Sequence, residues 1–406
     1  MTTRDRDAPR ASYREVLAEP RFRVLFGTRS LVIAADTLRM VALSVLVYGR
    51  TGSPLLASVA FAAGFAPQVA GGALLGALAD RMRPRPLVAG VYAMEAGAAA
   101  ALALLDLPVA GCLLLVAAVA CATPVVSGAV SRVAVQALPG DRYVLGRSLM
   151  VVASSVAQLA GLAFGGAAVA ALGPRGALLG TCAVYAVAAA LVVLFLDDLP
   201  AATRRDPAGP RRGLVGESGA VNRRLLADPA VRALLLAQWL PAAFVAGAES
   251  LLIPFAHDRG LPAAMGAVLM ACPPAGMIAG NLACGRLLRP SARERLVVPL
   301  MALVGLPLLP LAAGPPATVA AALLAVAGAA FAYELGIQRR FVDAVPEAER
   351  GQAFGLLSTG MMTLQGVGPV LSGALAEAAG PGTAIGAAGA AAVLAAVWLR
   401  PLLGRV

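Results

Sequence analysis

The sequence predicts an all-α membrane protein with twelve transmembrane helices arranged as two six-helix bundles. Of its 406 residues, 59% are hydrophobic and only 14% are charged, and the mean hydropathy is +0.81. A soluble chain carries about 25% charged residues. The apolar residues also form blocks of about 20 residues rather than stripes on amphipathic elements, which is typical of membrane-spanning helices. These observations exclude a soluble enzyme.

The apolar blocks define spans 1 to 12 and their grouping into domains. Before span 1 lies a polar, basic segment, residues 1–23, which lacks the apolar core of a cleavable signal peptide. The Pro-, Gly- and Arg-rich segment 197–229 has no apolar period and predicts a cytoplasmic linker between a bundle at 24–196 and a bundle at 230–403. The spans lie near residues 24–48, 55–79, 87–105, 108–131, 148–171, 177–196, 230–256, 262–285, 296–313, 317–338, 353–376 and 383–403.

The distribution of basic residues predicts the orientation of the chain. All 33 basic residues are arginine, and two of them, Arg29 and Arg39, lie within span 1. With both termini in the cytoplasm, 28 arginines fall on cytoplasmic segments and three, Arg50, Arg175 and Arg259, fall outside. This asymmetry follows the positive-inside rule and predicts a multi-pass protein of the inner (plasma) membrane with cytoplasmic termini. The net charge of +11 therefore reports orientation, and we expect no nucleic-acid partner.

The two bundles resemble each other along the chain. A constant offset of 207 residues aligns Gln158 with Gln365 and Gly161 with Gly368, and it aligns the Gly-Pro pair at 173–174 with the pair at 380–381. Parallel six-helix repeats about an axis along the membrane normal are typical of one large transporter architecture. In that architecture the substrate binds near the middle of the membrane, between the two halves.

The loop between spans 2 and 3, "GALADRMRPRPL" at residues 76–87, carries a specific motif. It resembles the loop signature G-x-L-A-D-R-x-G-R-R/K-x-x-L of the major facilitator superfamily, and it departs from that signature at Arg83 and Pro84. Together with "GSPLLASVAFAAGFAPQVAGGALLGALADR" and "ALPGDRYVLGRSLMVVASSVAQLAGLAFGGAAVAALG", it makes nearly the whole chain similar to the twelve-helix drug-efflux branch that includes enterobactin and macrolide exporters.

This resemblance implies a gate on the cytoplasmic side. In the family, the loop acid pairs with basic residues and with a helix N-terminus of the other half, which holds that side shut. A carboxylate gains about 0.3–1 kcal/mol at a helix N-terminus. The gate residues that the resemblance and the repeat give for this chain are Gly76, Asp80, Arg81, Arg85, Arg132 and Arg339.

Span 5 contains "GLAFGG" at residues 161–166, which resembles the antiporter motif G-x-x-x-G-P-x-x-G-G. Gly161, Gly165 and Gly166 are its matching glycines, while Ala157 and Leu162 replace the first glycine and the proline. Small residues at this spacing also let helices approach closely, so packing alone explains them equally well. If the antiporter role holds, the resemblance favours export over import.

Acidic residues within the spans are the candidates for proton coupling. Spans 1, 4, 7 and 10 line the cavity in this superfamily, and an ionisable residue inside a membrane points to a function. Asp36, Glu249 and Glu334 lie in cavity-lining spans, and Glu95 lies in span 3. Three structural alternatives stay open: a static pair of Asp36 with Arg39, a pair of Arg39 with Glu95 that fixes the first bundle, and neutralisation of Glu334 by Arg339 or Arg340.

Polar and aromatic residues of the same spans are the candidates for binding a small-molecule substrate. The glutamines aligned by the repeat either bind substrate or join neighbouring helices. His257 has no second histidine near it, so we expect an interfacial residue and no metal site. The substrate candidates are Arg39, Thr37, Gln238, Tyr333, Gln338, Gln158, Gln365 and Phe244.

These features predict a secondary active transporter that exports small hydrophobic or amphipathic compounds by proton antiport with alternating access. The chain lacks the G-x-x-x-x-G-K-[ST] loop of ATP-driven pumps, so we expect no cofactor and the proton gradient as its energy source. We expect a monomer in the lipid bilayer. The alternatives are a proton-independent facilitator or importer of a small metabolite and a membrane sensor that transports nothing.

Overall fold

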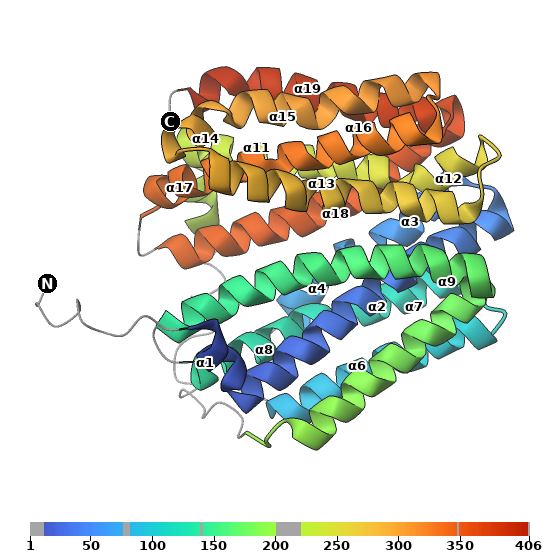
Figure 1. The fold of residues 1–406 in the computed structure, drawn as a ribbon, viewed down its shortest axis with the longest axis vertical. Coiled ribbons are helices and arrows are strands. Elements are labelled where there is room, and N and C mark those ends of the chain that lie inside the picture. The colour runs from blue at the N-terminus through green and yellow to red at the C-terminus, as the bar shows by residue number, and fades with distance from the viewer. Residues whose placement is uncertain (1–11, 76–81, 139–140, 200–220, 347–348, 405–406) are drawn as a thin grey trace, which may run out of the picture.

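The computed structural model describes residues 12–75, 82–138, 141–199, 221–346 and 349–404. The described chain is helical, and the helices run roughly side by side in two groups (Figure 1). Blue to green ribbons, the first half of the chain, form one group, and yellow to red ribbons form the other. The predicted all-α membrane fold is confirmed. The first and last described residues lie at one end of the molecule, which we call the termini end; the other is the opposite end.

The N-terminal half starts with a short helix and a long one. α1 has Ser12 as its N-cap, and the Ser12 hydroxyl accepts from the Glu15 amide. The long helix α2 follows and starts at Pro20, where a residue without an N–H leaves no unpaired donor. It ends before Gly52, which adopts a left-handed conformation with a φ of 63°. The helices are α1 (Tyr13–Ala18), α2 (Pro20–Thr51), α3 (Pro54–Ala62), α4 (Ala66–Leu75), α6 (Pro84–Leu104), α7 (Val109–Ala120), α8 (Thr123–Ala137) and α9 (Asp141–Phe195).

The C-terminal half follows the same plan, with more prolines inside its spans. Asp228 caps the first of these helices by accepting hydrogen bonds from the amides of Ala230 and Val231. The elements are α11 (Pro229–Ser250), α12 (Leu252–His257), α13 (Ala263–Leu287), α14 (Pro290–Arg295), α15 (Val297–Gly305), η2 (Leu306–Ala313), α16 (Ala317–Ala329), η3 (Ala330–Tyr333), α17 (Glu334–Ala344), α18 (Arg350–Ala379) and α19 (Pro381–Leu403).

Two sharp turns repeat the same backbone geometry in the two halves. Inside α9, Gly173 has φ 71° and ψ 172°, and Pro174 then starts the return helix. Between α18 and α19, Gly380 has φ 86° and ψ 154°, and Pro381 is the first residue of α19. Positive φ is accessible to glycine at little cost, and proline is favoured at the first helical position. The turns lie 207 residues apart, at the offset that the sequence repeat predicts.

Where the structure describes them, the predicted spans lie on helical residues; span 2, predicted at 55–79, is described as far as residue 75. In the described part of the chain, nine helices are long and apolar enough to cross a membrane, and one of them, Leu145–Phe195, is the hairpin that holds spans 5 and 6. Val297–Ala313 is a shorter apolar segment, and it corresponds to span 9. Span 11 lies within α18, which is 30 residues long.

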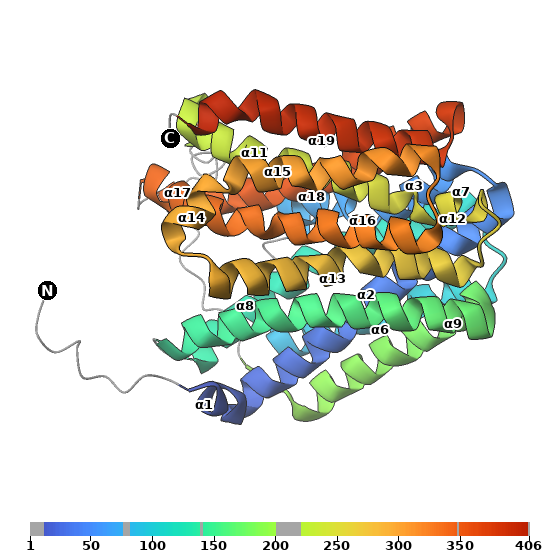
Figure 2. The same ribbon diagram turned by 45° about the horizontal axis from the view of Figure 1, so that its top comes forward.

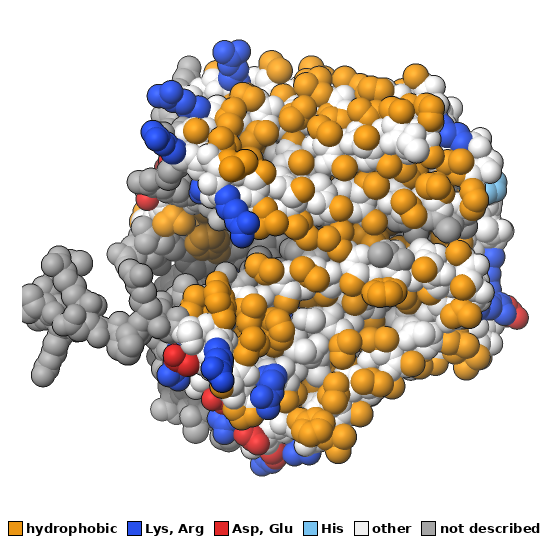
Figure 3. All heavy atoms as spheres, in the orientation of Figure 1, with side chains coloured by type: hydrophobic (Ala, Val, Ile, Leu, Met, Phe, Trp, Pro, Cys, Tyr) orange, Lys and Arg blue, Asp and Glu red, His pale blue; other side chains and the backbone are white. Residues whose placement is uncertain are grey.

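The surface of the helical region is mostly apolar. Leucine, valine and phenylalanine side chains are exposed along the sides of the molecule, among them Leu114, Phe164 and Leu194, which are about 70% exposed. Figure 3 shows these apolar side chains over the sides, with arginines gathered near the two ends. A wide apolar band between charged ends is the surface that a bilayer requires.

Candidate proton and substrate site

The two halves meet closely at the opposite end. There α18 packs against α3, and the Ser53 hydroxyl of the N-terminal half donates to the carboxylate of Glu377 in α18. The amide of Leu55, in the first turn of α3, donates to the same carboxylate at 3.3 Å. Deeper in this contact, the hydroxyls of Ser58 and Ser250 lie 3.0 Å apart. These bonds join the halves and close the opposite end.

A second contact between the halves lies beside the first. The Tyr48 hydroxyl donates to Asp258 at 3.4 Å, and its ring meets His257 edge-on with the ring centroids 5.2 Å apart. The neighbouring Arg259 lies over the ring of Phe255, where burial lowers the pKa of its guanidinium and Asp258 opposes that shift. His257 thus contacts the N-terminal half through the ring of Tyr48.

The termini end is open between the halves. Figure 3 shows a hollow there, between the surfaces of the two groups of helices. Ion pairs that the structure describes at this end stay within one half: Arg21 with Asp197 at 2.8 Å, Arg83 with Asp198 at 2.7 Å, and Arg224 with Glu349 at 2.7 Å. Among the residues that the structure describes, these pairs at the termini end hold each half together without joining it to the other.

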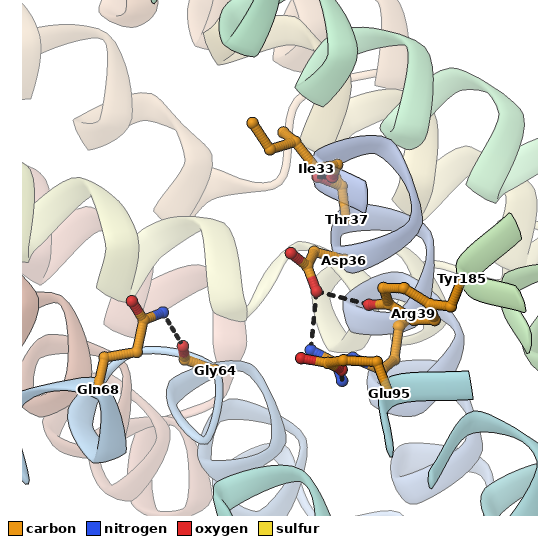
Figure 4. A network of polar contacts seen from close by, with 8 residues as sticks. All are labelled: Ile33, Asp36, Thr37, Arg39, Gly64, Gln68, Glu95 and Tyr185. Carbon is orange, nitrogen blue, oxygen red and sulfur yellow. Dashed lines mark hydrogen bonds and ion pairs between the residues drawn. The ribbon is translucent and has the colours of Figure 1, made fainter. Parts of the chain in front are cut away.

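A cluster of charged and polar side chains lies in the middle of the N-terminal half (Figure 4). Arg39 of α2 forms ion pairs with Asp36, at 3.0 Å, and with Glu95 of α6. The Tyr185 hydroxyl, from the second part of α9, donates to the same Asp36 oxygen at 2.5 Å. We call these four residues, Asp36, Arg39, Glu95 and Tyr185, the charge cluster. One guanidinium thus bridges two carboxylates from different helices.

The sequence builds the charge cluster from helical spacing and from helix packing. Asp36 and Arg39 are three residues apart, so their side chains leave the same face of α2. α9 packs along α2 and α6, which places Tyr185 beside this face. The guanidinium of Arg39 also lies 5.7 Å from the Tyr185 ring centroid. Charged side chains inside a membrane are usually paired with one another in this way, because an unpaired charge there is costly.

Exposure separates the two acids of the charge cluster. The side chains of Arg39 and Glu95 are 7% and 4% exposed, whereas that of Asp36 is 33% exposed. The predicted pair of Arg39 with Glu95 is therefore present, and it joins spans 1 and 3. Asp36 is the member of the charge cluster that a ligand or water can reach.

Two residues that were not among the predicted site residues line a small cavity next to the charge cluster. Arg29 and Tyr92 face this cavity together with Asp36, Glu95 and Thr123. The Arg29 guanidinium donates to the Ser127 hydroxyl of α8 at 3.3 Å, while the Tyr92 hydroxyl is buried without a hydrogen bond to a described residue. The sequence could have indicated Arg29, because an arginine inside an apolar span is energetically costly and usually has a partner or a function.

The two acids predicted in the C-terminal half stand apart from this cluster. Glu249 lies near the end of α11, and Glu334 begins α17; both are partly buried. Neither carboxylate forms an ion pair or a hydrogen bond with another described residue. Arg340 is directed elsewhere, because its guanidinium donates to the carbonyls of Leu403 and Glu294.

Some predicted substrate residues are held inside the helices. Thr37 donates to the Ile33 carbonyl of its own helix, and Gln238 donates to the Leu234 carbonyl. Tyr333 is fully buried, and its hydroxyl donates to the Ala237 carbonyl at 3.0 Å, which ties η3 to α11. These three side chains position helices around the hollow rather than reaching into it in this state.

Other predicted substrate residues are more accessible. Gln158 and Gln338 are exposed, and Gln365 and Phe244 are half-buried. Neither Gln158 nor Gln365 makes a hydrogen bond with another described residue.

The predicted gate is described only in part. Gly76, Asp80 and Arg81 lie outside the described residues, as does the side chain of Arg339. Arg85 donates to the Val193 carbonyl near the end of α9, and Arg132 donates to the Met82 carbonyl at 3.1 Å. Both arginines thus contact neighbours in their own half.

The glycines of the antiporter-like stretch lie against α2. A Cβ added at Gly161 would collide with the backbone of Ala34 and with Thr37, and one at Gly165 would touch Leu38 at 3.4 Å. Gly166 is buried. The close approach of α9 to α2 leaves no room for a side chain at position 161, so packing alone explains this glycine. The same approach places the stretch beside residues of α2 that lie within one helical turn of Asp36 and Arg39.

Two bundles of membrane-spanning helices, joined at one end and hollow between them at the other, define a secondary transporter. Residues 25–341 match the family model of the Major Facilitator Superfamily, and the chain belongs to this family, which is non-enzymatic. A comparison with curated protein sequences finds no match.

Solved structures of the same superfamily show the same fold. A bacterial homolog of the human lysosomal transporter Spinster, in an inward-facing and unoccupied conformation, is 16% identical with a TM-score of 0.68, covering 97% of this chain and 96% of that one. The nucleoside transporter NupG is 15% identical with a TM-score of 0.71, covering 93% and 98%. A POT family transporter in complex with a thioalcohol-conjugated peptide is 11% identical with a TM-score of 0.69, covering 95% and 96%.

Proposed function

We propose that this secondary transporter exports small hydrophobic or amphipathic compounds in exchange for protons, with Asp36 as the coupling carboxylate. The charge cluster carries this proposal. It holds two carboxylates and one guanidinium, and the more accessible carboxylate belongs to a helix that the superfamily resemblance places at the cavity. Export, rather than import, follows from the resemblance to the drug-efflux branch.

The charges of the cluster suggest how a proton and a conformation are linked. With both acids ionised, Asp36, Arg39 and Glu95 carry one net negative charge, and a single proton makes the group neutral. Arg29, two turns before Asp36 on α2, moderates this charge from the adjoining cavity. Enclosing an unbalanced charge away from water is costly. A proton on Asp36 therefore favours a state in which the hollow has closed, and a cationic or amphipathic ligand competes for the deprotonated acid.

The open termini end supports the same cycle. If the termini are cytoplasmic, as the arginine distribution predicts, the structure is the inward-open state, which loads the exported compound. An inward proton contributes about 2.3 kcal/mol per 100 mV of membrane potential, which is enough to move a compound against its gradient.

Transport in proteoliposomes tests the proposal. Vesicles with an internal pH-sensitive dye receive ethidium or an uncharged hydrophobic compound, and proton movement is recorded with and without an imposed pH gradient. We expect compound-dependent proton flux for the unaltered chain and its loss in Asp36→Asn. Asp106→Asn is the matched control, since Asp106 is 81% exposed and remote from the charge cluster.

The proton-independent alternative makes the opposite prediction. A facilitator or importer would move its substrate at the same rate with or without the pH gradient. Normal gradient-dependent transport by Asp36→Asn would remove Asp36 from the mechanism. A thermal-shift ligand screen at two pH values, run on both chains, identifies compounds for these measurements.

A further inference from the structure

A cavity with charged and apolar walls lies at the termini end of the C-terminal half. It has a volume of about 600 Å³, is open to the outside, and is lined by α14, α15, α17 and α19. Two of these helices, α15 and α19, lie on the side of the C-terminal half away from the N-terminal half, with the C-terminus near α19 (Figures 1 and 2). The cavity is therefore separate from the charge cluster and from the hollow between the halves.

The rim of this cavity is positively charged. Arg295, Arg340 and Arg400 line it together with one acid, Glu294, which gives a net charge of +2. Arg340 is anchored by the carbonyls of Leu403, at 3.2 Å, and Glu294, at 3.4 Å. Arg295 and Arg400 are exposed. Two exposed guanidiniums and one anchored guanidinium thus surround the opening.

The wall of the cavity is apolar and continues into the membrane-spanning surface. Val297, Val298 and Ala302 of α15 face Ala396 and Val397 of α19. Val397 is 60% exposed, and beyond it the side chains of Leu394 and Trp398 are 68% and 57% exposed. A ligand with a charged group at the rim can therefore lay an apolar chain along these helices without leaving the bilayer.

We propose that this cavity binds an anionic phospholipid from the leaflet at the termini end. Arg295 and Arg400 would bind the headgroup phosphate, and one acyl chain would lie between α15 and α19. Arginine binds phosphate through paired N–H groups, and basic pockets between membrane helices suit anionic headgroups. Inorganic phosphate could bind the arginines of the rim, but it has no apolar chain to contact the apolar wall. Arg340 connects the site to α17 of span 10, whose first residue is Glu334.

Native mass spectrometry of the purified full-length chain tests this site. The chain is titrated with phosphatidylglycerol or with zwitterionic phosphatidylethanolamine, and the apparent affinity for each is measured. Arg295→Gln and Arg400→Gln remove charge at the rim without disturbing the anchored Arg340. Arg23→Gln is the control, because Arg23 is exposed at the termini end but lies on α2 of the N-terminal half.

The unaltered chain should prefer phosphatidylglycerol, and each rim substitution should weaken that lipid about fivefold, because a basic residue near a membrane surface contributes about that factor. Arg23→Gln should keep the preference. Equal loss in Arg23→Gln, no loss in either rim variant, or displacement of the lipid by millimolar inorganic phosphate would overturn the proposal. Unchanged thermal unfolding of both rim variants shows that the loss concerns binding and not folding.

Discussion

The bridge from Arg39 to two acids predicts a large and non-additive effect on stability. Arg39→Met would leave Asp36 and Glu95 without their cation, and Glu95 is 4% exposed, so water cannot replace it. Breaking a buried ion pair by removing one partner costs about 3–5 kcal/mol. Glu95→Gln is milder, because Arg39 keeps Asp36 at 3.0 Å and the new amide still accepts a hydrogen bond. We expect about 1–3 kcal/mol for that loss.

The double variant separates a coupled pair from two independent effects. In Arg39→Met with Glu95→Gln, the buried acid that lost its cation is gone, so the double variant should be less destabilised than the sum of the single variants. We expect a coupling energy of about 2 kcal/mol or more. Arg83 and Asp198 are the control pair: they are 2.7 Å apart but 62% and 41% exposed, and exposed pairs couple by about 0–1 kcal/mol.

Unfolding of the N-terminal half can be followed through a single thiol. Cys112 is 2% exposed in this half, and a fluorogenic thiol reagent labels it as the half unfolds. The other four cysteines are replaced by alanine in every variant. Additive single effects, or a coupling no larger than that of Arg83 with Asp198, would refute the view that the Arg39 guanidinium stabilises the buried carboxylate of Glu95.

Two further substitutions test the packing against α2 and the closure of the opposite end. Gly161→Ala should destabilise the chain by about 1–3 kcal/mol, because its Cβ meets the Ala34 backbone. Gly180→Ala in the same helix has no atom within 4 Å and should be neutral or stabilising in the same unfolding assay. Glu377→Gln weakens the bonds to Ser53 and Leu55, so the opposite end should open more often by severalfold. Faster thiol labelling of Ser250→Cys would report this opening, and labelling at an unchanged rate would show that Glu377 does not hold the closure.

The positions of the spans could be predicted because each is a property of a continuous stretch of chain. Apolar length alone locates α2, and the Gly-Pro pairs mark the turns at Gly173 and Gly380. Helical spacing likewise places Asp36 and Arg39 on one face. The family resemblance added the cavity-lining role of span 1 and gave the gate residues, of which Gly76, Asp80 and Arg81 fall outside the described residues.

Partners from distant helices were harder to predict. Tyr185 comes 149 residues after Asp36, and a span that is apolar all round does not reveal which neighbour its one tyrosine faces. Tyr333 was expected to meet substrate, yet its hydroxyl ties η3 to the Ala237 carbonyl. A polar group in a span indicates a need for a partner, but sequence alone does not say whether that partner is a ligand or a backbone carbonyl.

The matched turns at Gly173 and Gly380 indicate that the two halves share a common origin. Each turn joins its two helices with no intervening loop, and each depends on a glycine in a conformation that other residues adopt with strain. Such a turn at the same register in both halves is most simply explained by its presence in the ancestral half before duplication. The charge cluster, by contrast, has no counterpart among the described residues of the C-terminal half. The two halves therefore share the backbone of this turn but not the ionisable residues that we propose for coupling.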